Sequence, residues 1–188
     1  MAPIGTGCVH IYTGNGKGKT TAALGLALRA AGRGLKTCIV QFMKGRHYGE
    51  LDAVKMTGGL IIVEQFGHPE FCSFGKEPDP ADVERAASAL ERIRELMDAK
   101  ACDILVADEM TTACLFRLIT EDDVLAAIAS RPGGMELVIT GRGATQRMIE
   151  AADLVTEMRE VKHYYTRGID AREDRKSTRL NSSHVSQS

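Results

Sequence analysis

The sequence predicts an α/β domain in which helices cover both faces of a mostly parallel β-sheet. Short, continuous apolar runs alternate along the chain with longer segments of helical character, and strands that are apolar throughout are typical of a sheet buried on both faces. The chain of 188 residues is long enough for one such domain with a hydrophobic core. Its polar motifs follow the apolar runs, and ligands of parallel α/β sheets bind at the carboxyl ends of the strands.

The first half of the predicted domain holds three strands and one helix. A short strand is expected at residues 9–12, followed by an Ala- and Leu-rich helix at 19–31 that ends before two glycines. The β-branched, apolar segment TCIVQF at 37–42 predicts a buried strand, and LIIVE at 60–64 predicts another.

The second half continues the alternation. Apolar residues recur at spacings of three and four from 80 to 97, with charged residues between them, which predicts an amphipathic helix. DILVADE at 103–109 predicts a strand that ends in two acidic residues, and a short helix at 121–129 stops before a Pro-Gly turn. The remaining expected elements are a strand at 136–141, a helix at 144–152 and a last strand at 154–158.

Composition narrows the class of protein. The formal net charge of −1 gives no electrostatic reason to expect nucleic-acid binding. No apolar run approaches the roughly 20 residues that span a bilayer, and the N-terminus lacks a signal-peptide pattern, so we expect a cytoplasmic protein without membrane contact. The five cysteines contain no C-x-x-C pair, which favours buried free thiols in a reducing compartment.

The segment TGNGKGKT at 13–20 is typical of a phosphate-binding loop, or P-loop, between a strand and a helix. Its glycines allow successive backbone N–H groups to face phosphate oxygens, Lys19 would meet the terminal phosphates, and the hydroxyl of Thr20 would serve Mg²⁺. The helix that follows adds the positive end of its dipole. The usual pattern has glycine where this chain has Thr13, and the alternative is a glycine-rich turn that binds nothing. The flanking strand and helix favour a P-loop NTPase-like phosphate site.

The acidic pair after the apolar run ILVA is the expected partner of this loop. In P-loop proteins an acid at the end of a buried strand holds the Mg²⁺ site directly or through water, and Asp108 fits that position. Glu109 is a candidate to orient a water molecule, the ribose or the metal shell. The pair predicts nucleotide and Mg²⁺ binding without specifying the reaction.

Five motifs together carry a resemblance to a known family. TGNGKGKTTAALGLALRAAG, VQFMKG, LVADEMT, RPGGMELVITGRG and ADLVTEMREVKHYYTRGI occur in this order. They resemble the P-loop ATP:corrinoid adenosyltransferases, also called cob(I)alamin adenosyltransferases, from residue 8 to 172. GNGKGKTT and TGRG are fairly specific to the family, and its members share the threonine at the start of the loop.

The resemblance implies a transfer reaction. Co(I) of a reduced corrinoid (cob(I)alamin) attacks the 5′ carbon of ATP, and the whole triphosphate leaves, in the synthesis of adenosylcobalamin. It implies Mg²⁺, a flavodoxin-like reductase as electron donor and a homodimer. Lys19, Thr20, Asp108 and Glu109 are the implied catalytic residues, with Thr20 and Asp108 at the metal. The implied ligand-binding residues are Gly14, Asn15, Gly16, Lys17, Gly18, Lys19, Thr20, Thr21, Arg142, Phe71 and Phe74.

Several positions have more than one candidate role. Arg142 is a candidate for the triphosphate or for a surface ion pair, and Lys44 for the corrinoid rim or a phosphate. Some family members use a Phe/Trp pair to displace the lower axial ligand of cobalt. This chain has no Trp, so Phe66, Phe71 or Phe74 would have to serve, while His68 is interpreted as a loop residue.

Two further expectations concern the ends of the chain and the reaction. Residues 1–174 are expected to form a single domain, whereas 175–188 are polar, Ser-rich and non-periodic, which predicts a disordered tail of foreign sequence.

Two rival functions are a P-loop ATPase or kinase that acts on another substrate, and a regulatory module that binds ATP without chemistry.

Overall fold

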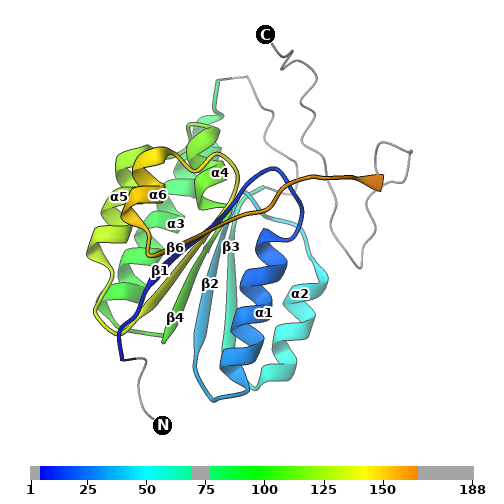
Figure 1. Ribbon diagram of the computed structural model, residues 1–188, viewed down its shortest axis with the longest axis vertical. Coiled ribbons are helices and arrows are strands. Elements are labelled where there is room, and N and C mark those ends of the chain that lie inside the picture. The colour runs from blue at the N-terminus through cyan, green and yellow to red at the C-terminus, as the bar shows by residue number, and fades with distance from the viewer. Residues whose placement is uncertain (1–4, 69–76, 165–188) are drawn as a thin grey trace.

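A single six-stranded sheet forms the centre of the molecule (Figure 1). The computed structural model describes residues 5–68 and 77–164. The strands lie in the order β3-β2-β4-β5-β1-β6, and every neighbouring pair is parallel. Their bounds are β1 Val9–Thr13, β2 Thr37–Phe42, β3 Ile61–Phe66, β4 Ile104–Asp108, β5 Glu136–Thr140 and β6 Leu154–Glu157. The predicted fold class is confirmed.

Helices cover both faces of this sheet. On one face lie α1 and α2, with a short 3₁₀ helix, η1, after α2; on the other lie α3, α4, α5 and α6 (Figure 1). Their bounds are α1 Lys19–Ala31, α2 Gly49–Ala53, η1 Val54–Thr57, α3 Pro80–Asp98, α4 Met110–Leu115, α5 Glu121–Ser130 and α6 Gln146–Ala151. None of the helices in these described parts of the chain is long and apolar enough to cross a membrane.

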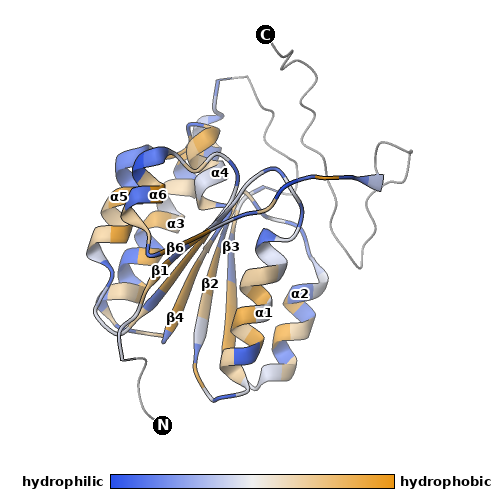
Figure 2. Ribbon diagram, in the orientation of Figure 1, coloured by the Kyte–Doolittle hydropathy of each residue, from blue (hydrophilic) through white to orange (hydrophobic). Residues whose placement is uncertain are grey.

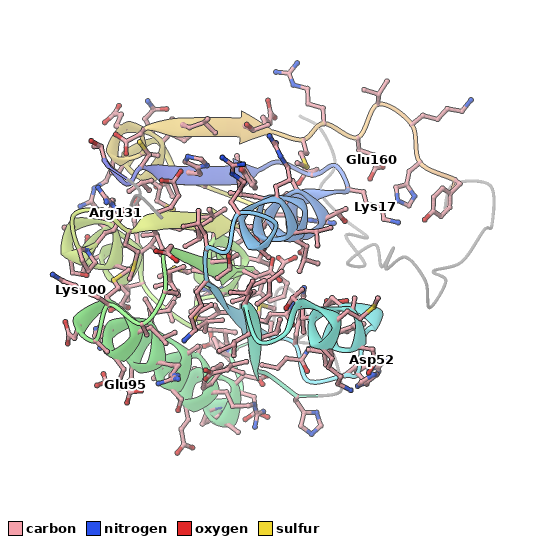
Figure 3. All side chains as sticks on the ribbon, turned by 90° about the horizontal axis from the view of Figure 1, so that it is seen from below. Lys17, Asp52, Glu95, Lys100, Arg131 and Glu160 are labelled. Carbon is pink, nitrogen blue, oxygen red and sulfur yellow. The ribbon has the colours of Figure 1, made fainter. Side chains whose placement is uncertain are left out.

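Each face of the sheet has its own hydrophobic core. Figure 2 shows the apolar strands of the sheet between the helices on its two faces. Beneath α1, the fully buried Ala23 and Ala27 pack against Ile39 and Val106 of the sheet. The larger core on the opposite face joins α3, α4 and α5 to the sheet through residues such as Ile93. Charged side chains that Figure 3 labels, including Glu95 and Lys100, extend from the periphery. The burial of both faces explains why the strands are apolar throughout.

The predicted elements are confirmed with small shifts of their ends. The third strand covers 61–66 instead of 60–64, and the sixth helix covers 146–151 instead of 144–152, because the side chain of Thr145 caps it by accepting a hydrogen bond from Met148 N. The sequence did not predict α2, η1 or α4, which have four to six residues each and therefore no room for a helical repeat. The cysteines within the described residues are free thiols, at Cys8, Cys38, Cys102 and Cys114.

Candidate active site

The P-loop connects the carboxyl end of β1 to the first turn of α1. Gly18 is the N-cap of α1 and has a φ of 116°, a left-handed conformation that glycine adopts without steric cost. No acidic residue lies in the first turn of the helix. The unpaired N–H groups and the positive end of the helix dipole therefore face the loop without a competing carboxylate, which favours an anion there.

Lys19 folds back over the loop that precedes it. Its ammonium donates hydrogen bonds to Gly14 O at 2.8 Å and Gly16 O at 2.9 Å, and the residue is 7% exposed. Burial lowers the pKa of Lys19; the charges of Glu109 and Asp108 oppose the shift. The ammonium is thus held at the centre of the loop by neutral carbonyl oxygens, for which an anionic phosphate oxygen is a stronger substitute.

The segment after β6, residues 158–164, lies against the outer side of this loop. Gly16 N donates a 2.6 Å hydrogen bond to Met158 O, and a Cβ atom at Gly16 would lie 2.6 Å from that same oxygen. Lys17 donates to the hydroxyl of Tyr164 at 3.1 Å, with its ammonium 5.6 Å from the ring centroid. Gly16 is therefore required because a second chain segment approaches it closely. This requirement is separate from phosphate binding, which explains the glycines of the P-loop pattern.

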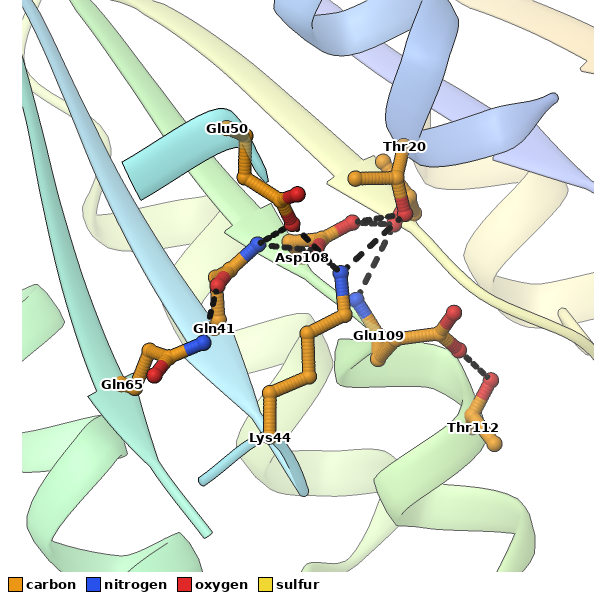
Figure 4. A network of polar contacts seen from close by, with 9 residues as sticks. Thr20, Gln41, Lys44, Glu50, Gln65, Asp108, Glu109 and Thr112 are labelled. Atoms are coloured by element: carbon orange, nitrogen blue, oxygen red, sulfur yellow. Dashed lines mark hydrogen bonds and ion pairs between the residues drawn. The ribbon is translucent and has the colours of Figure 1, made fainter. Parts of the chain in front are cut away.

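Asp108, at the end of β4, is the centre of a polar network (Figure 4). Its Oδ1 accepts hydrogen bonds from the hydroxyls of Thr20 at 2.8 Å and Thr140 at 2.6 Å. Its Oδ2 accepts from Gln41 Nε2 at 3.1 Å and from Lys44 Nζ at 2.6 Å. The side chain is fully buried, which by itself would raise its pKa, but the Lys44 charge and these hydrogen bonds outweigh burial and lower the pKa. Asp108 is a carboxylate whose acceptor positions are filled by protein donors.

Lys44 follows β2 and reaches back into this network. It is 4% exposed, and its ammonium lies 3.9 Å from Glu50 Oε1 and 3.5 Å from Thr20 Oγ1. Burial lowers the pKa of Lys44, yet the adjacent Asp108 carboxylate prevails and raises it, so the side chain stays charged. The preceding residue, Met43, has a φ of 57°, a turn that directs the chain out of the strand.

Glu109 and Arg142 are placed beside the network by main-chain contacts. Glu109 has a φ of 62°, and its N–H donates to the hydroxyl of Thr140 at 3.0 Å. Thr112 donates to Glu109 Oε2 at 2.5 Å and accepts from Arg142 N at 2.8 Å. Both charged residues act electrostatically on Lys19. The residues that follow β4 and β5 thus place a carboxylate, Glu109, and a guanidinium, Arg142, near the P-loop lysine.

The structure brings most of the predicted site residues together. Lys19, Thr20, Asp108 and Glu109 share one site at the carboxyl ends of β1 and β4, while Asn15, Lys17 and Thr21 are exposed on the loop and helix. Phe71 and Phe74 lie outside the described residues, and Phe66 is a β3 residue packed against the larger core.

Sequence reasoning missed three side chains that contact Asp108 or Lys44. These are Gln41, Glu50 and Thr140. A glutamine inside the apolar strand TCIVQF was the one signal available for Gln41. Lys44, a candidate for the corrinoid rim or a phosphate, pairs with Asp108 in the structure.

The donor set fits magnesium bound together with a nucleotide. Mg²⁺ prefers oxygen ligands and in nucleotide sites takes one or two from the protein and others from phosphates and water. Thr20, Asp108 and Glu50 supply hydroxyl and carboxylate oxygens within one network. Among residues 5–68 and 77–164, no cluster of three His, Cys, Asp or Glu side chains is present that would hold a metal without a substrate.

Comparisons with known proteins point to one family. A model of the family "ATP:corrinoid adenosyltransferase BtuR/CobO/CobP" matches residues 5–174. The corrinoid adenosyltransferase CobA of Salmonella typhimurium is 33% identical over 166 residues, which cover 88% of this chain and 83% of the relative. A corrinoid adenosyltransferase of Pseudomonas aeruginosa is 36% identical over 174 residues, covering 88% of this chain and 81% of that protein.

A solved structure supports the fold alone. The KaiC-like protein of Pyrococcus horikoshii superposes with a TM-score of 0.54 at 18% identity, over 85% of this chain and 74% of that one.

Proposed function

Because the chain belongs to the ATP:corrinoid adenosyltransferase family, a family of transferases that act on corrinoids with ATP, we propose that its P-loop site performs the adenosyl transfer. The substrates are ATP and a reduced corrinoid, cob(I)alamin or a close relative. Co(I) attacks the 5′ carbon of ATP, a Co–C bond forms, the C5′–O bond breaks, and its electron pair leaves with the triphosphate. No protein nucleophile is required, because the cobalt supplies the attacking electron pair.

The observation that carries this proposal is the cationic loop at the helix N-terminus. Lys19 is buried at its centre, and its hydrogen bonds to Gly14 O and Gly16 O are replaceable by phosphate oxygens. The triphosphate gains negative charge as the C5′–O bond breaks, so cations and N–H donors that are already in place lower the barrier. We assign contacts with the nucleotide to the P-loop and its surroundings: Gly14, Asn15, Gly16, Lys17, Gly18, Lys19, Thr20, Thr21 and Arg142.

Asp108 acts through its neighbours in this proposal. It orients the Thr20 hydroxyl by accepting its hydrogen bond at 2.8 Å, so the lone pairs of the Thr20 oxygen face away from Asp108, toward Lys44 Nζ and a metal. Bound Mg²⁺ would neutralise charge on the departing triphosphate. Its hydrogen bonds hold Thr20, Thr140 and Lys44 in place, and the carboxylate would serve the metal directly or through water.

Three finer assignments rest on the family resemblance. We propose that Phe71 and Phe74 contact the corrinoid, that the chain works as a homodimer, and that a flavodoxin-like reductase supplies electrons in the cytoplasm. Size-exclusion chromatography with light scattering tests the homodimer directly: a monomeric mass would contradict it.

The decisive experiment identifies the products. The protein is incubated with ATP, Mg²⁺ and chemically reduced cobalamin, followed by absorption spectroscopy for adenosylcobalamin and chromatography for phosphates. Adenosylcobalamin and intact triphosphate in equal amounts are expected. ADP with phosphate would indicate hydrolysis or kinase chemistry instead, and binding without turnover would indicate a regulatory module.

A further inference from the structure

A lysine ammonium occupies the place in the site where oxygen ligands converge. Lys44 Nζ lies 2.6 Å from Asp108 Oδ2, 3.5 Å from Thr20 Oγ1 and 3.9 Å from Glu50 Oε1 (Figure 4). These are two carboxylates and a hydroxyl, the kinds of ligand that Mg²⁺ prefers. The residue is 4% exposed, so bulk water hardly reaches the ammonium. A protein cation and a metal ion would therefore compete for the same oxygens.

The backbone beside Lys44 is hydrogen-bonded to β3, so we assign the change of position to the Lys44 side chain. Met43, just before it, has a φ of 57° and donates from its N–H to Phe66 O at 3.0 Å, which ties the end of β2 to the end of β3. Gln41, which pairs with Asp108 in the strand register, also donates to Glu50 Oε1 at 3.4 Å. The oxygens around the ammonium thus come from β4, α1 and α2, and Gln41 of β2 donates to two of them.

Charge balance shows what the ammonium does in the absence of a nucleotide. The carboxylates of Asp108, Glu109 and Glu50 all act electrostatically on Lys44, and its ammonium pairs directly with Asp108. An uncompensated buried carboxylate is costly, and it attracts any hard cation that reaches it. Because Lys44 already neutralises this carboxylate, the affinity of the carboxylate for free Mg²⁺ is low.

We propose that Lys44 is a resident cation of the magnesium site, which excludes Mg²⁺ from the nucleotide-free protein and yields its place when ATP brings phosphates. The inference rests on the proposed function only in assuming that Mg²⁺ and ATP bind at this site. Phosphate oxygens give the ammonium new acceptors and give the metal additional ligands. Mg²⁺ and ATP consequently bind with positive coupling, each raising the affinity for the other by the same factor.

Magnesium titration of the nucleotide-free protein tests this role. In Lys44→Met and Lys44→Gln, calorimetry and thermal unfolding should show Mg²⁺ binding that is about 5- to 150-fold tighter than in the parent, the usual range of a coupling free energy. Lys44→Arg keeps the charge and should resemble the parent. Lys55→Met removes an exposed lysine that pairs with Asp52 beyond the site, and it should also resemble the parent. A lysine with a merely structural role would not raise metal affinity when removed.

The double variant Asp108→Asn with Lys44→Gln tests whether the gain in Mg²⁺ affinity depends on the Asp108 carboxylate. It removes the carboxylate that the lysine neutralises, so the gain in Mg²⁺ affinity should disappear while stability recovers relative to Lys44→Gln alone. The inference is overturned if both single variants bind Mg²⁺ no more tightly than the parent, or if the coupling between Mg²⁺ and ATP is unchanged in them. Adenosylcobalamin formation by the parent is measured separately, so failure of the proposed function is distinguishable from failure of this inference.

Discussion

The hydroxyl of Thr20 donates a 2.8 Å hydrogen bond to Asp108 Oδ1, although 88 residues separate the two in sequence. Thr20 belongs to the first turn of α1, and Asp108 ends β4. The bond joins the loop expected to bind phosphate to the acid expected to serve the metal. It also fixes the orientation of the hydroxyl, so the proton of Thr20 points to protein and not to a ligand.

Asp108→Asn is expected to impair both turnover and stability. The amide keeps an oxygen for Thr20, but its N–H₂ group would face the donors Gln41 and Lys44, leaving a buried ammonium without its anion. Breaking a buried pair in this way costs about 3–5 kcal/mol, which urea denaturation measures. Asp52→Asn, at an exposed ion pair with Lys55, is the control and should change little. An Asp108→Asn protein as stable and active as the parent would contradict the network's role.

Lys19→Ala should weaken ATP binding about 10- to 100-fold, because a hydrogen bond to a charged group contributes about 1.5–3 kcal/mol. Isothermal titration calorimetry with ATP measures the change. Lys55→Ala removes an exposed lysine and serves as the matched control. Equal affinities in Lys19→Ala and the control would show that the ammonium does not contact the nucleotide.

Replacing each of two buried strand threonines by valine should change stability differently. Thr140→Val removes a hydroxyl that donates to Asp108 Oδ1 and accepts from Glu109 N, so it should cost about 1–3 kcal/mol of stability and lower turnover. Thr37→Val replaces a hydroxyl that has no hydrogen-bond partner among the described residues, so stability should be unchanged or higher. Chemical denaturation measures the free energy of unfolding of both variants. Equal losses of this free energy would mean that the Thr140 hydrogen bonds contribute nothing to stability.

Gly16→Ala should displace the segment after β6 and weaken the P-loop. The added Cβ would meet Met158 O at 2.6 Å and the carbonyl carbon of Arg159 at 2.7 Å, which are backbone atoms that cannot rotate away. We expect lower thermal stability, faster proteolysis after residue 157 and weaker ATP binding. Gly25→Ala is the opposite case: its Cβ meets nothing within 4 Å, and alanine favours a helix interior by about 1 kcal/mol. Intact protease resistance in Gly16→Ala would refute the close approach.

The sequence by itself determined the elements and the central motif. The strand TCIVQF and the helix at 19–31 have the predicted bounds, because their signals are local: a continuous β-branched run and an Ala-rich stretch that ends at glycines. The P-loop was recognisable for the same reason, since the residues that form it are consecutive in the chain. The family was recognisable because five such motifs occur in one order.

Tertiary structure alone decided which side chains meet at the site. Placing β5 between β4 and β1 brings Thr140 to Asp108, and the parallel register of β2 with β4 sets Gln41 beside the same carboxylate. The left-handed turn at Met43 then sends Lys44 to that carboxylate. Strand order and register are set by the packing of whole elements against two cores, and no short stretch of sequence contains that information.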